Sequence, residues 1–543
     1  MTAMSGCSSS NDSANNTAIN RPVPNPFLSS SVYGMTHFDS SQSDSTPYGP
    51  PRGFYDVDTT SRPIAYGGPT NIITLDSTNK DYMWAFGTDR VGYVYKGAGN
   101  WHTVARYEAM ADASSNTMPA IPDDNYRLFG EMTAVGLTTT TMDTFLQTFF
   151  GASYASYYGN GTYVLVDKDN VAYANYGTNL YAFALNDPAD PAAGMKVLYK
   201  MTDVITTIQA GYPTPPQDTR LSGISMTYDG HLVVTFSNGV AVIDRDLNTA
   251  NIHFYRFADT EIVTNSIAVD EKNGIYVASG PNLGVVSSGT MRKLVWTGST
   301  ISDKDADGAW SSPYDSSAPD LPPIIKIGYG TGSTPTLMGF GTDPDRLVVI
   351  TDGSKQMKLV AFWRDKIPAG FVDRIAGQIQ VKCGFTTLPT WLQSEQSVVV
   401  YGYGAFVVNN IPETYSSQIV SASKILQVSL MGPAEPTSYG VERFQWNPST
   451  HSWSSVWGRS DVSSTSMVPI HSVSGNMAVI NGYRPEYGWE VLGLDWDNGS
   501  IVHQTVFGDE NFGNGAYAIL QYLDNGDLLF NSIAGPFRVH YGN

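Results

Sequence analysis

The chain is poor in cysteine, and this limits the sites it can build. Its 543 residues contain two cysteines, Cys7 and Cys383, and neither belongs to a Cys-x-x-Cys pair or to a cluster of histidines. Structural zinc sites of the usual spacing are therefore excluded. The sequence allows a disulfide between the two cysteines, but we expect Cys383 to be a buried thiol.

Positive charge is also scarce. Lys and Arg total 31 against 50 Asp and Glu, which gives a formal net charge of −19, and the basic residues form no cluster. Nucleic-acid binding needs clustered Lys and Arg on phosphates, so we expect no nucleic-acid partner. Such acidity is typical of a protein that stays soluble in a salty or extracytoplasmic setting, and a cationic partner is the alternative.

Long apolar runs and the common catalytic motifs are missing as well. No run reaches the roughly eighteen apolar residues that a membrane span requires. Gly-x-Ser-x-Gly, His-Glu-x-x-His and a P-loop are absent, and the glycine-rich residues 328–332 lack the Lys that phosphate binding needs. The eight histidines are scattered over the chain, which does not favour an iron centre held by four of them.

The chain does have a repeat of short apolar runs joined by Gly and Asx turns. The clearest unit covers residues 262–294, in which apolar residues 266–269 and 275–278 flank an acidic turn at 270–274. This pattern predicts an antiparallel meander, which must pack against copies of itself. Similar units begin near residues 221, 334, 467 and 516, with weaker ones near 81, 162 and 398. We therefore expect an all-β propeller of about eight blades, with seven as the alternative.

Three parts follow along the chain. Residues 1–26 are rich in Ser, Asn and Pro and predict a flexible tether; residues 27–74 predict an irregular arm that packs on the propeller; and residues 75–543 predict the propeller itself. We expect the arm to supply the strand that completes the blade begun by the C-terminus. Residues 142–150 predict one helix, inserted between blades and packed into the core.

The sharpest metal signal is the run Asp303, Asp305, Asp307 followed by Gly308. Alternating carboxylates before a glycine turn place oxygen ligands around a hard cation, so the run predicts a structural calcium site. Position twelve of the run is Tyr314 and not Glu, which excludes an EF-hand. The alternative is a solvated acidic turn.

Residues 264–277, with Asn265 directly before the run 266–269 and Asp270 directly after it, carry a family resemblance. They resemble the repeat of the SMP-30/gluconolactonase and strictosidine-synthase-like propellers. The resemblance implies that Asn265 is a ligand of a catalytic divalent cation and that a small organic molecule binds at one mouth of the channel. We expect the cation to be calcium. This chain departs from the family in its length, in having Ser266 where the family has Gly, and in lacking a matching Glu near its start. The alternative is a strand and turn without chemistry.

Two further groups could carry chemistry. Asp352, with Thr334 in the same unit, could act as a metal ligand or general base, although such pairs also occur as structural hydrogen bonds. The arm holds His37, Asp39 and Asp44. We expect the arm to cross one mouth of the propeller, with His37 as a general acid or base oriented by Asp39 or Asp44. The alternative is a packed arm whose polar residues satisfy its own turns.

The start of the chain resembles the processing site of a bacterial lipoprotein, with small residues before Cys7 and a polar stretch after it. This implies export to the periplasm, the outer membrane or the cell exterior, and attachment through lipid at Cys7; the alternative is a chance Cys. We therefore expect a monomeric, exported propeller that is a metal-assisted hydrolase of the lactonase type. A non-catalytic binding or scaffold propeller at the cell envelope is the alternative.

Overall fold

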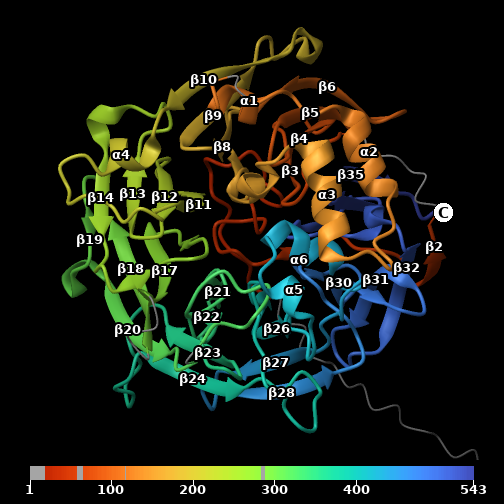
Figure 1. Cartoon of the computed structure of the whole chain (residues 1–543). Helices are drawn as coiled ribbons and strands as arrows, with labels where there is room; N and C mark the ends of the chain where they lie inside the picture. Colours follow the sequence, from red (N-terminus) through yellow and green to blue (C-terminus); the bar gives the residue numbers. More distant parts are fainter. Residues whose placement is uncertain (1–18, 58–64, 116–117, 283–287, 319, 543) are drawn as a thin grey trace, which may run out of the picture.

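The computed structural model describes residues 19–57, 65–115, 118–282, 288–318 and 320–542. In this part of the chain the strands form eight sheets, which are arranged as a ring around a central axis (Figure 1). The sheets follow one another in the order of the sequence, and all strand pairs made between repeat strands are antiparallel. The prediction of an all-β propeller is confirmed.

We number the sheets 1 to 8 along the chain. Sheets 1 to 4 contain β3–β6 (Ile73–Asp76, Tyr82–Phe86, Val91–Tyr95, His102–Tyr107), β7–β10 (Leu165–Val166, Ala172–Tyr176, Asn179–Leu185, Met195–Met201), β11–β14 (Leu221–Met226, Leu232–Phe236, Gly239–Ile243, His253–Arg256) and β15–β20 (Glu261–Ile262, Ala268–Val269, Gly274–Pro281, Ser288–Trp296, Ile301–Ser302, Trp310–Asp315). Sheets 5 to 8 contain β21–β24 (Thr336–Met338, Leu347–Thr351, Lys358–Trp363, Ile375–Gln380), β25–β28 (Val399–Tyr401, Gly404–Val408, Val441–Asn447, Ser452–Arg459), β29–β32 (Ile470–Ser472, Met477–Arg484, Gly488–Asp495, Ile501–Gly508) and β33–β35 (Leu520–Tyr522, Leu528–Ser532, Gly535–Val539).

Burial differs between the middle and the outermost strands of a sheet. Every residue of β12 and β13 is buried, because neighbouring sheets cover both faces of these strands. Such strands read as continuous apolar runs, which is the pattern that the repeat units show. The outermost strand β28 is instead mostly exposed and is rich in Ser. The core is therefore a series of apolar layers between consecutive sheets.

Helices are few and lie between or within sheets. In the described residues the α-helices are α1 (Ala109–Ala113), α2 (Asp123–Glu131), α3 (Thr139–Phe150), α4 (Val204–Ile208), α5 (Ser417–Val420) and α6 (Lys424–Leu430). The short 3-10 helices are η1 (Tyr154–Gly159), η2 (Pro191–Ala193), η3 (Thr249–Asn251), η5 (Asp305–Asp307) and η6 (Asn511–Gly513). Helix α3 confirms the predicted insertion; a capping box of Thr138 and Thr141 starts it, and Met142, Leu146 and Phe150 are buried. Helices α3, α5 and α6 lie over one face of the ring (Figure 1).

The N-terminal arm runs through the middle of the ring (Figure 1) and pairs with the inner strands. In a propeller these inner strands are edges with unpaired N–H groups. Carbonyl oxygens of the arm accept from four consecutive sheets: Ser40 from Val269 at 2.7 Å, Ser41 from Leu337 at 3.0 Å, Ser43 from Val400 at 3.0 Å and Asp44 from His471 at 2.9 Å. The arm thus satisfies backbone groups that the sheets leave open on the axis.

The arm also adds two strands, but not where the sequence predicts them. β1 (Ser45–Thr46) pairs in parallel with β29, and β2 (Gly53–Asp56) pairs in parallel with β32, so both extend sheet 7. Sheet 8 keeps three strands in the described part of the chain. The prediction that the arm completes the last blade is wrong, because the arm leaves the axis along sheet 7 and wraps around it.

A substitution at Tyr33 tests how much the buried contacts of the arm contribute to stability. Its buried hydroxyl donates to Tyr522 O at 2.8 Å, accepts from Tyr522 N at 3.1 Å and lies 2.7 Å from Thr46 Oγ1. Tyr33→Phe leaves these buried groups unpaired, so we expect the free energy of unfolding to fall by about 1–3 kcal/mol in urea titrations. Tyr55→Phe, which removes a hydroxyl outside the buried arm contact, is the control. Equal stability of both variants would contradict this role for Tyr33.

Two buried histidines join the arm to sheet 7 and make its stability depend on pH. Burial lowers the pKa of His471 to about 3 and of His503 to about 4. Below about pH 6.5 these two histidines bind protons in the unfolded chain but stay neutral in the folded chain. The free energy of unfolding therefore decreases as the pH falls from about 6.5 toward 4. His503 Nδ1 donates to Pro51 O at 2.7 Å, a contact that Gln can replace. We expect His503→Gln to reduce the slope of unfolding free energy by up to about 1.4 kcal/mol per pH unit; an unchanged slope would contradict the assignment.

Candidate functional site: an axial cavity

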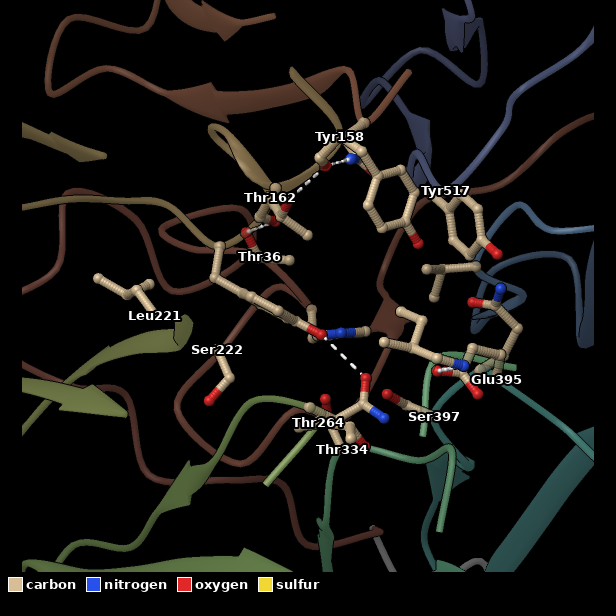
Figure 2. A pocket seen from close by; sticks show the side chains of 18 of the residues that line it. Thr36, Tyr158, Thr162, Leu221, Ser222, Thr264, Thr334, Glu395, Ser397 and Tyr517 are labelled. Atoms are coloured by element: carbon tan, nitrogen blue, oxygen red, sulfur yellow. Dashed lines mark hydrogen bonds between the residues drawn. The ribbon is translucent and has the colours of Figure 1, made fainter. Parts of the chain in front are cut away.

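A cavity of about 110 Å³ lies where the inner strands begin. Its wall is built by residues from all around the ring and from the arm, and Figure 2 shows many of their side chains. The lining residues used below are Thr36, His37, Asn71, Tyr158, Tyr163, Asn175, Arg220, Ser222, Asn265, Thr334, Glu395 and Tyr517.

The fold explains why these residues meet. Tyr163 precedes β7, Asn265 precedes β16, Thr334 precedes β21 and Glu395 precedes β25. The inner strands start at the same face of the ring, so residues just before them converge on the axis. The arm adds Thr36, whose backbone N–H donates to Val164 O at 3.0 Å. The cavity therefore lies on the propeller axis with the arm as part of its wall.

The arm brings His37 and Asp44 together. His37 Nδ1 lies 2.9 Å from each carboxylate oxygen of Asp44, and both residues are buried. Their φ angles are 63° and 50°, a left-handed conformation that costs about 1–3 kcal/mol for a residue with a side chain. Burial raises the pKa of Asp44, and His37 opposes this rise by charge and hydrogen bonding. The pair is held by a strained turn, as functional groups often are.

Asp39, the other predicted partner of His37, stabilises this turn instead. Its Oδ1 accepts from the backbone N–H of Ser41 at 2.8 Å, and its Oδ2 accepts from the hydroxyl of Ser43 at 2.5 Å. Burial raises the pKa of Asp39 to about 6 despite these bonds. Of the two carboxylates that the sequence offers, the structure places Asp44 on the His37 ring.

Asn265 also lines the cavity and is hydrogen-bonded to a tyrosine of the wall, Tyr163. The hydroxyl of Tyr163 donates to Asn265 Oδ1 at 3.2 Å, and the Tyr163 ring lies 6.2 Å from the His37 ring between centroids. Burial raises the pKa of Tyr163 to about 12, so the phenol is protonated near neutral pH. Asn265 Nδ2 is buried and has no hydrogen-bond partner among the described residues. One donor beside the cavity is therefore free for a ligand.

A buried ion pair forms another side of the cavity. Glu395 Oε2 lies 3.4 Å from Lys326 Nζ, and both side chains are 2% exposed. Burial raises the pKa of Glu395 and lowers that of Lys326. Glu395 Oε1 also accepts from the backbone N–H of Ile327 at 3.3 Å. The carboxylate is thus already neutralised by the protein.

Two tyrosines close the cavity toward the helices. Tyr158 of η1 and Tyr517 meet edge to face with centroids 5.4 Å apart, as Figure 2 shows. Asn71 Nδ2 donates to Tyr158 O at 2.5 Å and ties η1 to the start of sheet 1. Aromatic walls of this kind reduce access of water and strengthen the electrostatic interactions inside.

Asp352 lies outside this cavity. Its Oδ1 accepts from the backbone N–H groups of Ser354 at 3.1 Å and Lys358 at 2.9 Å, and its Oδ2 lies 3.3 Å from Lys358 Nζ. These contacts close the turn between β22 and β23. Thr334 does line the cavity, so the structure separates the two residues that the sequence pairs.

The three carboxylates of the predicted calcium run are exposed, and two of them bond to different residues. Asp303 Oδ2 accepts from Tyr255 Oη at 3.0 Å, and Asp307 Oδ2 accepts from Ser302 Oγ at 2.5 Å. Within the described ranges, no group of three or more His, Cys, Asp or Glu side chains is arranged to hold a metal ion. The calcium site stays a prediction.

The sequence misses Tyr163, Arg220 and Glu395 as cavity residues. The signal that finds Asn265, a polar residue just before the apolar run of an inner strand, also applies to Glu395 before residues 398–401. Cys383 is a buried free thiol, as predicted, whereas Cys7 falls outside the described residues.

The calcium prediction is tested at Asp305. If residues 303–308 bind calcium, added Ca²⁺ raises the melting temperature of the wild type, and Asp305→Ala removes most of that rise because one of few oxygen ligands is lost. Asp259→Ala, which changes an exposed carboxylate elsewhere, should keep the rise. Melting curves that are identical with Ca²⁺ and with chelator would show a solvated turn.

Comparisons with known proteins do not assign the chain to a family. No protein-family model matches the chain. An uncharacterized protein from Archaeoglobus fulgidus is 29% identical over 337 residues, which are 58% of this chain and 60% of that relative, so the chain spans about 60% of its length.

Among solved structures, Sqt1 from Saccharomyces cerevisiae is 11% identical, with 67% of this chain and 76% of that chain covered and a TM-score of 0.37. The periplasmic gluconolactonase PpgL from Pseudomonas aeruginosa is 12% identical, with 64% and 85% covered and a TM-score of 0.31. These TM-scores are too low to carry an argument about function. In the described part of the chain no helix has the length and apolar character of a membrane span.

Proposed function

We propose that this propeller is a hydrolase that opens a small lactone or short ester in the axial cavity, with His37 as the general base. The observation that carries the proposal is the His37–Asp44 pair in the cavity wall, where both Asp44 oxygens lie 2.9 Å from Nδ1. A carboxylate on one ring nitrogen fixes the tautomer and leaves the other nitrogen as the base.

The chemistry balances with the groups present. Asp44 holds the hydrogen on Nδ1, so Nε2 carries the lone pair. Nε2 takes a proton from a water molecule as the water oxygen bonds to the carbonyl carbon of the substrate. When the bond from that carbon to the ring or ester oxygen breaks, the protonated imidazole returns the proton to the leaving oxygen. Asp44 stabilises the imidazolium between the two steps.

Asn265 is suited to stabilise the negative charge that forms on the carbonyl oxygen. Its Oδ1 is occupied by the hydroxyl of Tyr163, which fixes the orientation of the amide. Its Nδ2 is the donor without a partner in the described residues. A preorganised donor of this type contributes most in a buried site, and Asn265 Nδ2 is itself buried.

The size of the cavity limits the substrate. A cavity of about 110 Å³ is slightly smaller than the ~150 Å³ cavity that accommodates benzene. A five- or six-membered ring with few substituents fits this volume. The substrate class is therefore small, in agreement with the small organic molecule that the family resemblance implies.

A divalent cation at Asn265, which the resemblance implies, has few free ligands here. Asn265 Oδ1 accepts from Tyr163, the Asp44 oxygens lie on His37, and Glu395 pairs with Lys326. Hard cations need several uncommitted oxygens, which this donor set does not offer. The cation stays a prediction, and no step above uses it.

A non-catalytic binding propeller at the cell envelope is the second candidate. The arm that fills part of the channel favours it, because a filled axis gives rigidity rather than access. Export, attachment through lipid at Cys7 and a monomeric state belong to both proposals. Metabolic labelling with an acyl chain, with Cys7→Ser as the control, tests the attachment.

The dyad is tested by His37→Gln. We expect hydrolysis of small lactones, followed by acid release, to fall by about a hundredfold to ten-thousandfold in kcat/KM, because the general base is lost. Asp44→Asn should lose activity as well, since an amide no longer fixes the tautomer of His37. The melting temperature of each variant is measured alongside.

The control is His503→Gln, which changes a buried histidine on sheet 7 that does not line the cavity. We expect it to keep the activity of the wild type. If a folded His37→Gln protein keeps full activity, His37 is not the general base. If the variant loses stability but each folded molecule keeps its activity, the role of the arm is purely structural.

A further inference from the structure

The charges around the axial cavity differ from those of the whole chain. The chain carries a formal net charge of −19. Besides His37, the charged side chains that line the cavity are Arg220 and Glu395. Behind them lie Lys326 and Lys424, and the carboxylates Asp44 and Asp352. Because Glu395 is paired with Lys326, Arg220 is the charged group of the wall that remains for an anion.

Arg220 is the lining cation that lacks a counter-charge. Among the described residues no carboxylate lies within ion-pair distance of its guanidinium, and its Nη2 is buried without a hydrogen-bond partner. Other arginines of the same region are paired: Arg245 lies 2.8 Å from Asp167, and Arg256 lies 2.8 Å from Asp259. A buried, unpaired guanidinium nitrogen is costly, which indicates that a ligand completes it.

The two lysines behind the wall are committed to the protein. Lys326 Nζ contacts Glu395 at 3.4 Å and donates to Ser394 O at 3.4 Å. Lys424 Nζ donates to Lys326 O at 2.8 Å and to Gln427 Oε1 at 3.2 Å. Neither lysine is among the residues that line the cavity. Arg220 is therefore the cation that can bond a ligand directly.

Besides Arg220, four lining residues have buried polar atoms without a hydrogen-bond partner in the described part of the chain, namely Asn175, Ser222, Asn265 and Glu395. Asn265 Nδ2 is a buried donor without a partner, and Asn175 Oδ1 is a buried acceptor without one among the described residues. Asn265 precedes β16 in sheet 4, and Arg220 directly precedes β11 in the adjacent sheet 3. The two donors thus belong to neighbouring sheets, and the acceptor belongs to sheet 2.

We propose that the axial cavity binds a small carboxylate anion through Arg220, with Asn175 accepting from a hydroxyl of the same molecule. A guanidinium presents a planar fork of N–H donors that matches a carboxylate. Phosphate is larger, carries more charge and is met by only one free cation here, so the carboxylate is the better match.

For the reaction this inference rests on the proposed function. It makes the substrate a lactone or short ester that carries a free carboxylate, so that Arg220 holds the carboxylate while the carbonyl lies near His37. Binding itself does not need the dyad. The two ideas can therefore fail separately.

Binding is measured by calorimetry and thermal shift with lactate, a hydroxy acid that fits the volume, and with lactamide, its uncharged analogue. The wild-type protein is used, because neither compound contains the lactone or ester bond that the proposed reaction breaks. We expect lactate to bind and lactamide to bind at least about tenfold more weakly, since a charge-assisted bond is lost. Equal binding of the two, or no binding of lactate up to about 10 mM, overturns the inference.

Arg220→Gln should weaken lactate by about tenfold to a hundredfold. The matched control is Arg256→Gln, an arginine of the same sheet that pairs with Asp259 and does not line the cavity. Equal loss in both variants overturns the role of Arg220. If Arg220→Gln does not fold, Arg220→Lys keeps the charge but not the fork, and unchanged affinity in that variant overturns the bidentate contact.

Hydrolysis separates the two proposals. The substrates are 5-oxotetrahydrofuran-2-carboxylate and γ-butyrolactone, which share the lactone ring and differ in the carboxylate. If the wild-type protein binds lactate but opens neither ring, the proposed hydrolase function is contradicted and the anion site is supported. If it opens both rings with equal kcat/KM, the anion site is contradicted and the hydrolase function is supported. A higher kcat/KM for the ring that carries the carboxylate supports both proposals.

Discussion

The pairing of the N-terminal arm with the inner strands is the interaction on which the rest of the structure depends. A ring of sheets leaves one edge of each sheet on the axis, with N–H groups that need acceptors. Ser40, Ser41, Ser43 and Asp44 provide carbonyl oxygens to four successive sheets. The same residues fill the channel, so closure of the axis and satisfaction of the edges are achieved by one segment.

The arm also creates the candidate site, because its path determines where His37 and Asp44 lie. To meet one inner edge after another, the chain must turn within a few residues, and His37, Phe38, Gln42 and Asp44 all adopt positive φ. Such turns in residues other than glycine persist only when the surroundings hold them. The dyad is therefore a product of the packing of the whole ring, and the strain is offset by the hydrogen bonds around it.

Most of the fold could be predicted from the sequence, because the strands of a propeller are short, apolar and separated by Gly or Asx turns. The position of the arm could not, since its contacts join residues hundreds of positions apart, as Tyr33 and Tyr522 do. The choice of Asp44 rather than Asp39 depends on side-chain directions in a left-handed turn. Arg220 gives no signal in sequence, because an unpaired charge is visible only once its neighbours are known.

A site built on the axis couples binding to the integrity of the ring. Its wall takes one short segment from nearly every sheet, so a ligand there contacts many sheets at once while the protein moves little. The unpaired donors of Arg220 and Asn265 cost stability in the empty protein, and a bound ligand that accepts from them removes that cost. Ligand affinity and fold stability therefore depend on the same buried polar groups of the cavity wall.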